Sequence, residues 1–262
     1  MKTTTPLGKN LKLAGFFVLG VIFLIILSLF WKLTILIAQS TVDSKHQFIV
    51  AVGNPTQKII CFTPETHRVS ILVIKEKINK DNTGKIIAIP VDAYIQGNAK
   101  ENLLHIFWKS MFTFTGNDTI NAVDKAKLWW YIRGMRLENI GNNEVSITMS
   151  EDIFSSIIQK LFLDKSLYQE AKTIQIINAT GIPGFGGKLA KLLTNIGGNV
   201  IIVNTGKTIE ETSLIQYTDE LSYSDKRIQK ILHIQMSKSE KKPVIADIII
   251  TIGKDTINTK VF

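Results

Sequence analysis

The sequence predicts an α/β protein with one N-terminal transmembrane helix, an α/β middle domain and a small C-terminal α/β domain that contains a βαβ unit. Three observations lead to this fold class. A charge-free apolar stretch near the N-terminus has the length that a helix needs to cross a bilayer. Runs rich in Val and Ile then alternate with stretches of helical periodicity. A glycine-rich turn between two apolar runs opens the last third of the chain. The predicted parts are a cytoplasmic tail (1–12), a transmembrane helix (13–38), the middle domain (46–165) and the C-terminal domain (172–262).

The apolar stretch runs without a charge from Leu13 to Trp31 and resumes after Lys32. A lysine near one end can extend to the headgroups, and tryptophan favours the interface. The flank before the stretch carries Lys2, Lys9 and Lys12 and no acid, which by the positive-inside rule places the N-terminus in the cytoplasm. We therefore expect a single-pass protein of the cell membrane, with its domains outside the cytoplasm.

A cleaved signal peptide is the alternative interpretation of this stretch. The apolar core of a signal peptide is normally about 7–15 residues, shorter than the stretch seen here. Leu36-Ile37-Ala38 is also a poor match to the small-x-small pattern of a cleavage site. The sequence favours an uncleaved anchor.

Charge and compartment narrow the class of partner. The chain has 31 basic and 22 acidic residues, and four of the lysines precede residue 39, so the exported part carries an excess of five basic residues. That balance suits anionic envelope polymers or lipid headgroups, and it also suits a solvated surface. Because this part lies outside the cytoplasm and shows no helix-turn-helix pattern, we expect no nucleic-acid partner.

Cysteine and histidine give no sign of metal or redox chemistry. The one cysteine, Cys61, cannot form an intrachain disulfide, and its apolar neighbours predict a buried side chain. The four histidines are far apart in sequence and no His/Cys cluster has ligand spacing. We expect no metal and no cofactor.

The middle domain is predicted to begin after a short polar stalk (39–46). Its strands are bounded by Gly, Pro, Asn or Asp, and its helices show apolar residues at helical spacing. Asp118 or Thr119 is a plausible N-cap for the second helix, and Ser150 for the third. The predicted strands are 46–53, 58–63, 68–74, 84–95 and 144–149, and the predicted helices are 99–112, 119–135 and 151–163.

A polar segment (164–172) is interpreted as the linker to the C-terminal domain. That domain begins with a strand, a glycine turn, a helix and a second strand, which is the order of a βαβ unit. A charged loop (237–243) precedes its last strand. The predicted strands are 173–179, 199–206, 212–218 and 246–255, and the predicted helices are 184–197 and 223–234.

The glycine turn, Asn178 to Leu193, does not fit the nucleotide-binding patterns. A P-loop needs glycine where Ile182 stands and a hydroxyl residue where Leu189 stands. The dinucleotide fingerprint starts at Gly184 but also fails at Leu189, and no acid ends the second strand.

Two interpretations of the turn stay open. In the first, its glycines shape a structural turn and let the helix approach the sheet. In the second, the free N–H groups at the helix N-terminus receive a carboxylate or phosphate of a wall polymer. The candidate ligand-binding residues of the second interpretation are Asn178, Thr180, Gly181, Gly184, Gly186 and Lys188.

The C-terminal domain resembles the LytR C-terminal domain family over about residues 172–256. The resemblance rests on three segments that occur in family order and spacing. They read IQIINATGIPGFGGKLAKLLTNIGGNVIIVNTG, EETSLIQY and ADIIITIGKD. Ala179 departs from the family, which often has glycine after the asparagine. The resemblance implies a small α/β domain of an envelope protein.

The family domain often follows a LytR-CpsA-Psr domain, whose members transfer glycopolymers from a polyprenyl-pyrophosphate carrier to peptidoglycan. The segments CFTPETHRVSILVI and IAIPVDAYI of the middle domain resemble parts of that domain. The family arginine of the second segment is Val91 here, which offers no charge to a pyrophosphate. Between Thr113 and Asp164 the chain has arginine only at 133 and 136, so Asp92 lacks its expected partners. The middle domain therefore resembles a reduced, inactive relative, or it is an unrelated α/β spacer.

Two surface features have ordinary interpretations. Trp129-Trp130-Tyr131 lies on a predicted helix, and core packing is favoured over a platform for glycan stacking. The basic clusters 238–242 and Lys226-Arg227 are expected to be solvated, with contact to an anionic polymer as the alternative.

These patterns favour a non-catalytic envelope protein, held in the membrane by one helix. Its C-terminal domain would bind peptidoglycan, an attached anionic wall glycopolymer, or a wall-assembly protein. The alternative is an active phosphotransferase of the LytR-CpsA-Psr type, for which we would expect Arg133, Arg136 and Asp92 to meet in one pocket. A third hypothesis is a scaffold whose strand edges pair with a partner in a membrane complex.

Overall fold

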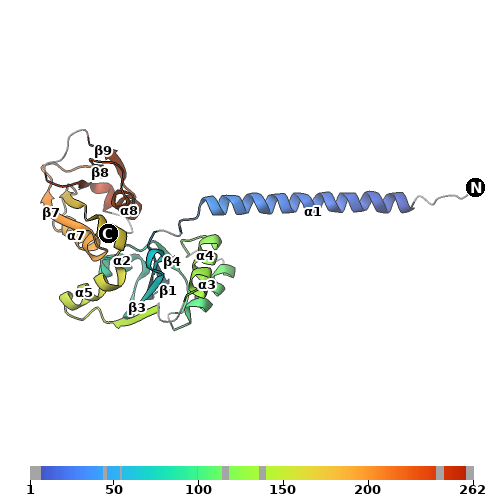
Figure 1. The fold of residues 1–262 in the computed structure, drawn as a ribbon, viewed down its shortest axis with the longest axis horizontal. Helices are drawn as coiled ribbons and strands as arrows, with labels where there is room; N and C mark the ends of the chain where they lie inside the picture. Colours follow the sequence, from blue (N-terminus) through green and yellow to red (C-terminus); the bar gives the residue numbers. More distant parts are fainter. Residues whose placement is uncertain are drawn as a thin grey trace, which may run out of the picture.

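The computed structural model describes residues 7–43, 46–53, 55–98, 100–113, 118–135, 140–239 and 245–257. A long helix, α1 (Leu7–Ala38), leads into a folded body built on two five-stranded sheets. Figure 1 shows α1 extending away from this body. The segment Ala14–Ala38 is long and apolar enough to cross a membrane, and its N-terminal position is consistent with a signal anchor or a signal sequence.

The first sheet has the strand order β4-β1-β2-β3-β5. Strands β1, β2 and β3 form antiparallel pairs, while β4 runs parallel to β1 and β5 runs parallel to β3. Its central strands are buried on both faces, which explains their continuous Val and Ile content. The strands are β1 (Phe48–Gly53), β2 (Thr56–Thr63), β3 (Arg68–Ile78), β4 (Ala93–Ile95) and β5 (Ile140–Val145).

Helices cover both faces of the first sheet. On one face α3 (Leu103–Phe112) and α4 (Ala122–Arg133) pack on β1 and β2. On the other face, α2 (Thr83–Ile87) and α5 (Glu151–Phe162) pack around Ile49, Cys61 and Leu72. The middle domain is thus a three-layer α/β unit.

The second sheet has the strand order β7-β6-β10-β8-β9. Strand β6, helix α7 and strand β7 form the predicted βαβ unit, with β6 and β7 parallel. Helices α6, α7 and α8 pack on one face of this sheet. Together the two sheets confirm the predicted fold class. The elements are α6 (Lys165–Glu170), β6 (Thr173–Asn178), α7 (Phe185–Asn195), β7 (Asn199–Thr205), β8 (Leu214–Tyr217), α8 (Tyr223–Leu232), β9 (Gln235–Lys238) and β10 (Ile248–Ile252).

The predicted long strand 84–95 is wrong. Its first part is the helix α2, and only its last residues form β4. Asn79 begins the helical segment because its side chain accepts a hydrogen bond from the backbone N–H of Asp81. Pro90 then lacks the N–H that a ladder needs, so the chain re-enters the sheet only at Ala93.

The predicted linker 164–172 is also wrong, because it contains α6. The Asp164 side chain caps this helix by accepting a hydrogen bond from the N–H of Leu167 (3.2 Å). Helix α4 begins later than predicted, with Asn121 as its N-cap in place of Asp118 or Thr119. Strand β5 ends at Val145, where Glu76 binds the N–H of Ile147 and turns the chain away from the sheet.

The predicted polar stalk packs against the body. Asp124 on α4 accepts hydrogen bonds from the backbone N–H groups of Thr41 (3.3 Å) and Val42 (3.1 Å) and from the Ser40 hydroxyl (2.5 Å). The amide nitrogen of Asn121 donates to the carbonyl oxygen of Leu36 in the last turn of α1 (3.1 Å). The long apolar helix α1 is therefore joined to the middle domain through specific contacts.

Candidate functional site

The polar side chains of the glycine turn bond to the turn itself. The Asn178 carboxamide oxygen accepts hydrogen bonds from the Thr180 N–H (3.2 Å) and hydroxyl (2.7 Å), and its nitrogen donates to the Ile182 carbonyl (2.8 Å). Thr180 in turn accepts from the N–H of Ile182 (3.0 Å). Gly181 and Gly184 have φ values of 80° and 76°, which glycine adopts without strain. These contacts support the structural interpretation of the turn.

The remaining candidates divide between the core and the surface. A Cβ atom added at Gly186 would lie 2.9 Å from Val203 Cγ1, so glycine there allows α7 to approach β7. Gly184 and Lys188 are exposed at the start of α7. All six predicted residues lie in this one turn, and those with surface access are Gly181, Gly184 and Lys188.

A buried arginine joins the two domains. Arg227 on α8 is 1% exposed. Its Nη1 lies 3.4 Å from Asp92 Oδ1 of the middle domain, and its Nε lies 3.2 Å from Asp164 Oδ2. The Tyr223 hydroxyl also donates to Asp164 (2.7 Å). Burial alone would lower the pKa of Arg227, but the two carboxylates outweigh it and raise the pKa, so the guanidinium stays charged.

The burial of Arg227 corrects the prediction that Lys226 and Arg227 are both solvated. Lys226 is exposed as expected, but Arg227 is buried, because the two carboxylates compensate its desolvation. Cys61 lies near this interface, and burial raises the pKa of its thiol to about 12. The position of Cys61 confirms the predicted buried cysteine.

Two further hydrogen bonds cross the interface. The Asn195 carboxamide on α7 donates to the Ala88 carbonyl (2.8 Å), and the Lys191 ammonium donates to Glu151 on α5 (2.5 Å). Asn195 is buried while Glu151 is exposed, so the first contact contributes more to fixing the domains.

Asp92 lies beside an interdomain cleft of about 340 Å³ that Val91 and Lys230 also line. One Asp92 oxygen accepts from the N–H of Ile49 (2.8 Å) and the other faces Arg227. Both oxygens are thus engaged by the protein. Arg133 lies elsewhere, on α4, with its guanidinium 5.2 Å from the ring centre of Trp129. Arg136 lies outside the described residues, and Arg133 does not line the cleft beside Asp92.

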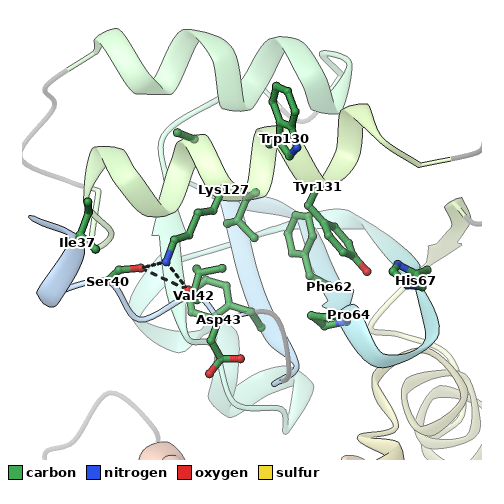
Figure 2. A pocket seen from close by; sticks show the side chains of 13 residues that line it. Ile37, Ser40, Val42, Asp43, Phe62, Pro64, His67, Lys127, Trp130 and Tyr131 are labelled. Atoms are coloured by element: carbon green, nitrogen blue, oxygen red, sulfur yellow. Dashed lines mark hydrogen bonds between the residues drawn. The ribbon is translucent and has the colours of Figure 1, made fainter. Parts of the chain in front are cut away.

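A larger, mainly apolar pocket of about 840 Å³ lies where the chain leaves α1. Figure 2 shows its lining, with the aromatic rings of Phe62 and Tyr131 close together, Trp130 pointing away from them on the other side of α4, and Ile37 of α1 at one end. The Lys127 ammonium closes part of the wall by donating to the Ser40 hydroxyl (2.6 Å) and the Val42 carbonyl (2.9 Å). Its volume is in the range of small-ligand sites.

The aromatic cluster on α4 is divided between core and surface. Tyr131 donates to the Thr63 carbonyl (3.1 Å), and Trp129 packs partly against the core. Trp130, however, is 70% exposed, so the core-packing prediction is wrong for this residue. A helix turns 100° per residue, which is why three consecutive aromatics cannot all face the core.

The second sheet has a distinctive face opposite its helices. The register aligns two rows of side chains that alternate with the buried core residues Ile174, Ile176, Ile248 and Ile250. We call these ten residues the uncharged face, because none is ionisable. It consists of Gln175, Ile177, Ile202, Asn204, Leu214, Gln216, Gln235, Ser237, Ile249 and Thr251.

This face was not predicted from the sequence, although a signal for it was present. Strand β10 reads as a continuous apolar run, so its alternation between core and surface is hidden. The alternation is visible in β6 and β8, where glutamine interrupts isoleucine and leucine. Among the described residues, no three His, Cys, Asp or Glu side chains could together hold a metal ion.

Comparison with known proteins identifies the C-terminal domain. The family model described as LytR cell envelope-related transcriptional attenuator, LytR_C, matches residues 171–256. No curated protein and no solved structure matches the chain. The matched range begins just before β6 and ends at Thr256, after β10, so it covers the whole second sheet with α7 and α8. Residues 171–256 of this chain are therefore a LytR_C domain.

Proposed function

We propose that this chain is a non-catalytic, membrane-anchored envelope protein whose LytR_C domain binds the glycan strands of peptidoglycan or an attached wall glycopolymer. The family match supports an envelope role, and α1 supports an anchor. In this proposal the N-terminus is cytoplasmic and both domains are extracytoplasmic, as the lysines before α1 suggest.

The observation that carries the binding proposal is the uncharged face. Its carboxamides at 204, 216 and 235 and its hydroxyls at 237 and 251 have surface access and can both donate and accept hydrogen bonds, while Gln175 in the middle of the face is buried. Sugar hydroxyls and N-acetyl groups require such partners. The intervening isoleucines offer flat apolar contact to sugar rings. A neutral face of this kind would bind the neutral part of a wall polymer.

The exposed rim of the glycine turn is a second, weaker contact in this proposal. Lys188 and the backbone at Gly184 lie at the end of β6, near the N-terminus of α7. A carboxylate or phosphate group of the polymer could be bound there by charge and by helix N–H groups.

Co-sedimentation with purified, protein-free cell wall tests the proposal. The full chain in detergent should pellet with the wall, and placing a charge on the face by Gln216→Glu or Thr251→Glu should lower the bound fraction about tenfold. The matched control is Lys226→Glu on the helical side of the same domain, which should bind as the unaltered chain does. Equal pelleting of all four proteins would refute binding through this face.

Salt dependence separates the two proposed contacts. Binding through the uncharged face should change little between low and moderate salt, because it involves no ion pairs. Binding that is lost with salt, and that Lys188→Gln also abolishes, would instead assign the interaction to the turn.

If the partner is a wall-assembly protein and not the polymer, neither the unaltered chain nor any variant should pellet with the protein-free wall. That result would favour a scaffold role, with the outer edges of β7 and β9 as the strands available to a partner.

A second candidate function is the LytR-CpsA-Psr type of phosphotransfer from a polyprenyl-pyrophosphate carrier. The large apolar pocket beside α1 favours it, since a lipid chain could enter there from the bilayer. The engagement of both Asp92 oxygens weighs against it. The test is transfer of labelled glycopolymer from the lipid carrier to peptidoglycan by the unaltered chain, with a reaction lacking the protein as the control. Transfer above the level of that control would support the enzyme, and its absence would contradict this second candidate.

A further inference from the structure

Four aromatic side chains form a continuous ridge across α3 and α4. We call Phe112, Trp108, Trp129 and Trp130 the aromatic ridge. Neighbouring ring centres are 5.1 Å apart for Phe112 and Trp108, 5.4 Å for Trp108 and Trp129, and 6.4 Å for Trp129 and Trp130. Trp108, Phe112 and Trp130 are 48%, 65% and 70% exposed. Large apolar side chains exposed side by side indicate an interaction surface.

The charges around the ridge are basic. The exposed ionisable residues within α3 and α4 are His105, Lys109, Lys127 and Arg133, while the acid Asp124 is buried. Glu101, just before α3, is half-buried and lies 3.8 Å from Lys109. This combination of exposed aromatic rings and basic groups is typical of proteins that contact anionic lipid headgroups.

The ridge is held close to the end of the apolar helix. Asn121, the N-cap of α4, donates to Leu36 in the last turn of α1 (3.1 Å), and Asp124 binds the residues that follow α1. Helix α4 therefore begins at the level where α1 would leave the bilayer. Figure 1 shows α3 and α4 on the side of the body next to the end of α1.

We propose that the aromatic ridge rests in the headgroup layer of the same bilayer that α1 crosses. The proposal rests on α1 being the membrane anchor of the proposed function. Tryptophan is enriched at the membrane interface because its ring is apolar and its N–H is polar. The tether makes the effective concentration of the bilayer at the ridge high, so modest contacts suffice. This contact would hold the body flat against the membrane.

Fluorescence quenching by brominated lipid tests the docking in vesicles of phosphatidylcholine and phosphatidylglycerol. The full chain with Trp31→Phe keeps the three tryptophans of the ridge as its emitters, since the chain has 4 Trp. Lipids brominated near the headgroup should quench this emission about twofold and shift it to shorter wavelength. Unquenched emission with the wavelength of water-exposed tryptophan would overturn the proposal.

A second reporter distinguishes failure of docking from failure of the anchor. The triple variant Trp108→Phe, Trp129→Phe and Trp130→Phe leaves Trp31 as the only emitter. Quenched Trp31 without quenching of the ridge would mean that the anchor holds and the docking is wrong. Unquenched Trp31 would mean that α1 is not inserted, and the proposed function would fail with it.

Serine substitutions identify the surface that makes the contact. Phe112→Ser combined with Lys109→Ser should weaken quenching of the remaining ridge tryptophans, because an apolar side chain and a basic group are lost. The matched control is Ile153→Ser with Tyr168→Ser, which changes two exposed apolar side chains on α5 and α6. If the first pair instead lowers the mass measured by light scattering and leaves quenching unchanged, the ridge joins two copies of the chain and the docking proposal is overturned.

Discussion

At the scale of single residues, Arg227 combines full burial with a charge that must be compensated. Asp92 comes from the middle domain, Asp164 from the start of α6 and Arg227 from α8, so one guanidinium connects three segments. A buried ion pair contributes little relative to well-packed apolar groups, but removing one partner leaves a buried charge without compensation. Removing the arginine should therefore destabilise the fold far more than the intact ion pair stabilises it.

Arg227→Met should lower the free energy of unfolding by about 3–5 kcal/mol, because Asp92 and Asp164 would then be buried without a counter-charge. Urea denaturation of the full chain in detergent measures this change. Lys226→Met is the matched control on the next, exposed position and should change stability by less than about 0.5 kcal/mol. Equal effects of the two substitutions would contradict the structure.

Two adjacent glycines provide a second contrast at this scale. A Cβ at Gly186 would contact Val203 Cγ1 at 2.9 Å, whereas a Cβ at Gly187 meets nothing within 4 Å. Gly186→Ala should therefore destabilise the domain by about 1–3 kcal/mol through overpacking. Gly187→Ala should stabilise it by about 0.5 kcal/mol, because alanine favours the helix. Thermal unfolding of the two variants should give shifts of opposite sign.

At the scale of elements, side-chain caps explain most of the differences between the predicted and observed structure. Strands β1, β2 and β3 follow directly from their Val and Ile content, and the βαβ unit follows from the apolar runs on either side of the glycine turn. Ser150 is the N-cap residue of α5, as predicted, although its side chain makes no capping hydrogen bond. The Ser222 cap of α8 was not predicted. Helix α6 was hidden by its polar composition, although Asp164 gives an N-cap signal. Contacts between distant segments could not be predicted, because Asp92 and Arg227 are 135 residues apart.

The candidate site was predictable only in part. The six residues of the glycine turn were identified from local sequence, and the structure shows how their backbone turns. The uncharged face required knowledge of strand order, since its residues come from five strands. The pocket beside α1 required the packing of the stalk on Asp124. Local patterns reveal local turns, and surfaces assembled from several segments depend on tertiary structure.

The start of β10 is tied to the start of β6 by Asp247. One carboxylate oxygen accepts hydrogen bonds from the Thr173 N–H (2.8 Å) and hydroxyl (2.7 Å), which lowers the pKa of Asp247 below its ordinary value. The stabilisation is therefore fully present above the unfolded pKa of about 3.9 and is lost as the pH falls through the lower folded pKa. Denaturation midpoints measured from pH 7 downward should show Asp247→Asn as less stable at neutral pH, with the difference shrinking in acid. A constant difference would refute this assignment.

At the scale of the whole molecule, the two domains should unfold together. Every tryptophan precedes residue 131, so fluorescence reports the N-terminal part and the middle domain, while far-ultraviolet circular dichroism reports both domains. The unfolding transitions measured by fluorescence and by circular dichroism should coincide in the unaltered chain, because Arg227 and Asn195 couple the domains. In Arg227→Met they should separate, and in Lys226→Met they should remain together. Separate transitions in the unaltered chain would mean that the interface is weak.

The hydrogen bonds between Asp124 and the residues after α1 also limit how far the two domains can move away from the end of α1. A chain on a long flexible stalk samples a deep volume above the bilayer, whereas here the stalk is packed against the body that it carries. The LytR_C domain is carried along by Arg227 and shares this restriction. In the proposed membrane-anchored protein, this restriction would confine the LytR_C domain to lateral diffusion in the membrane plane and to material directly above the lipid surface. Polymer that has already moved outward with the growing envelope would be beyond its reach.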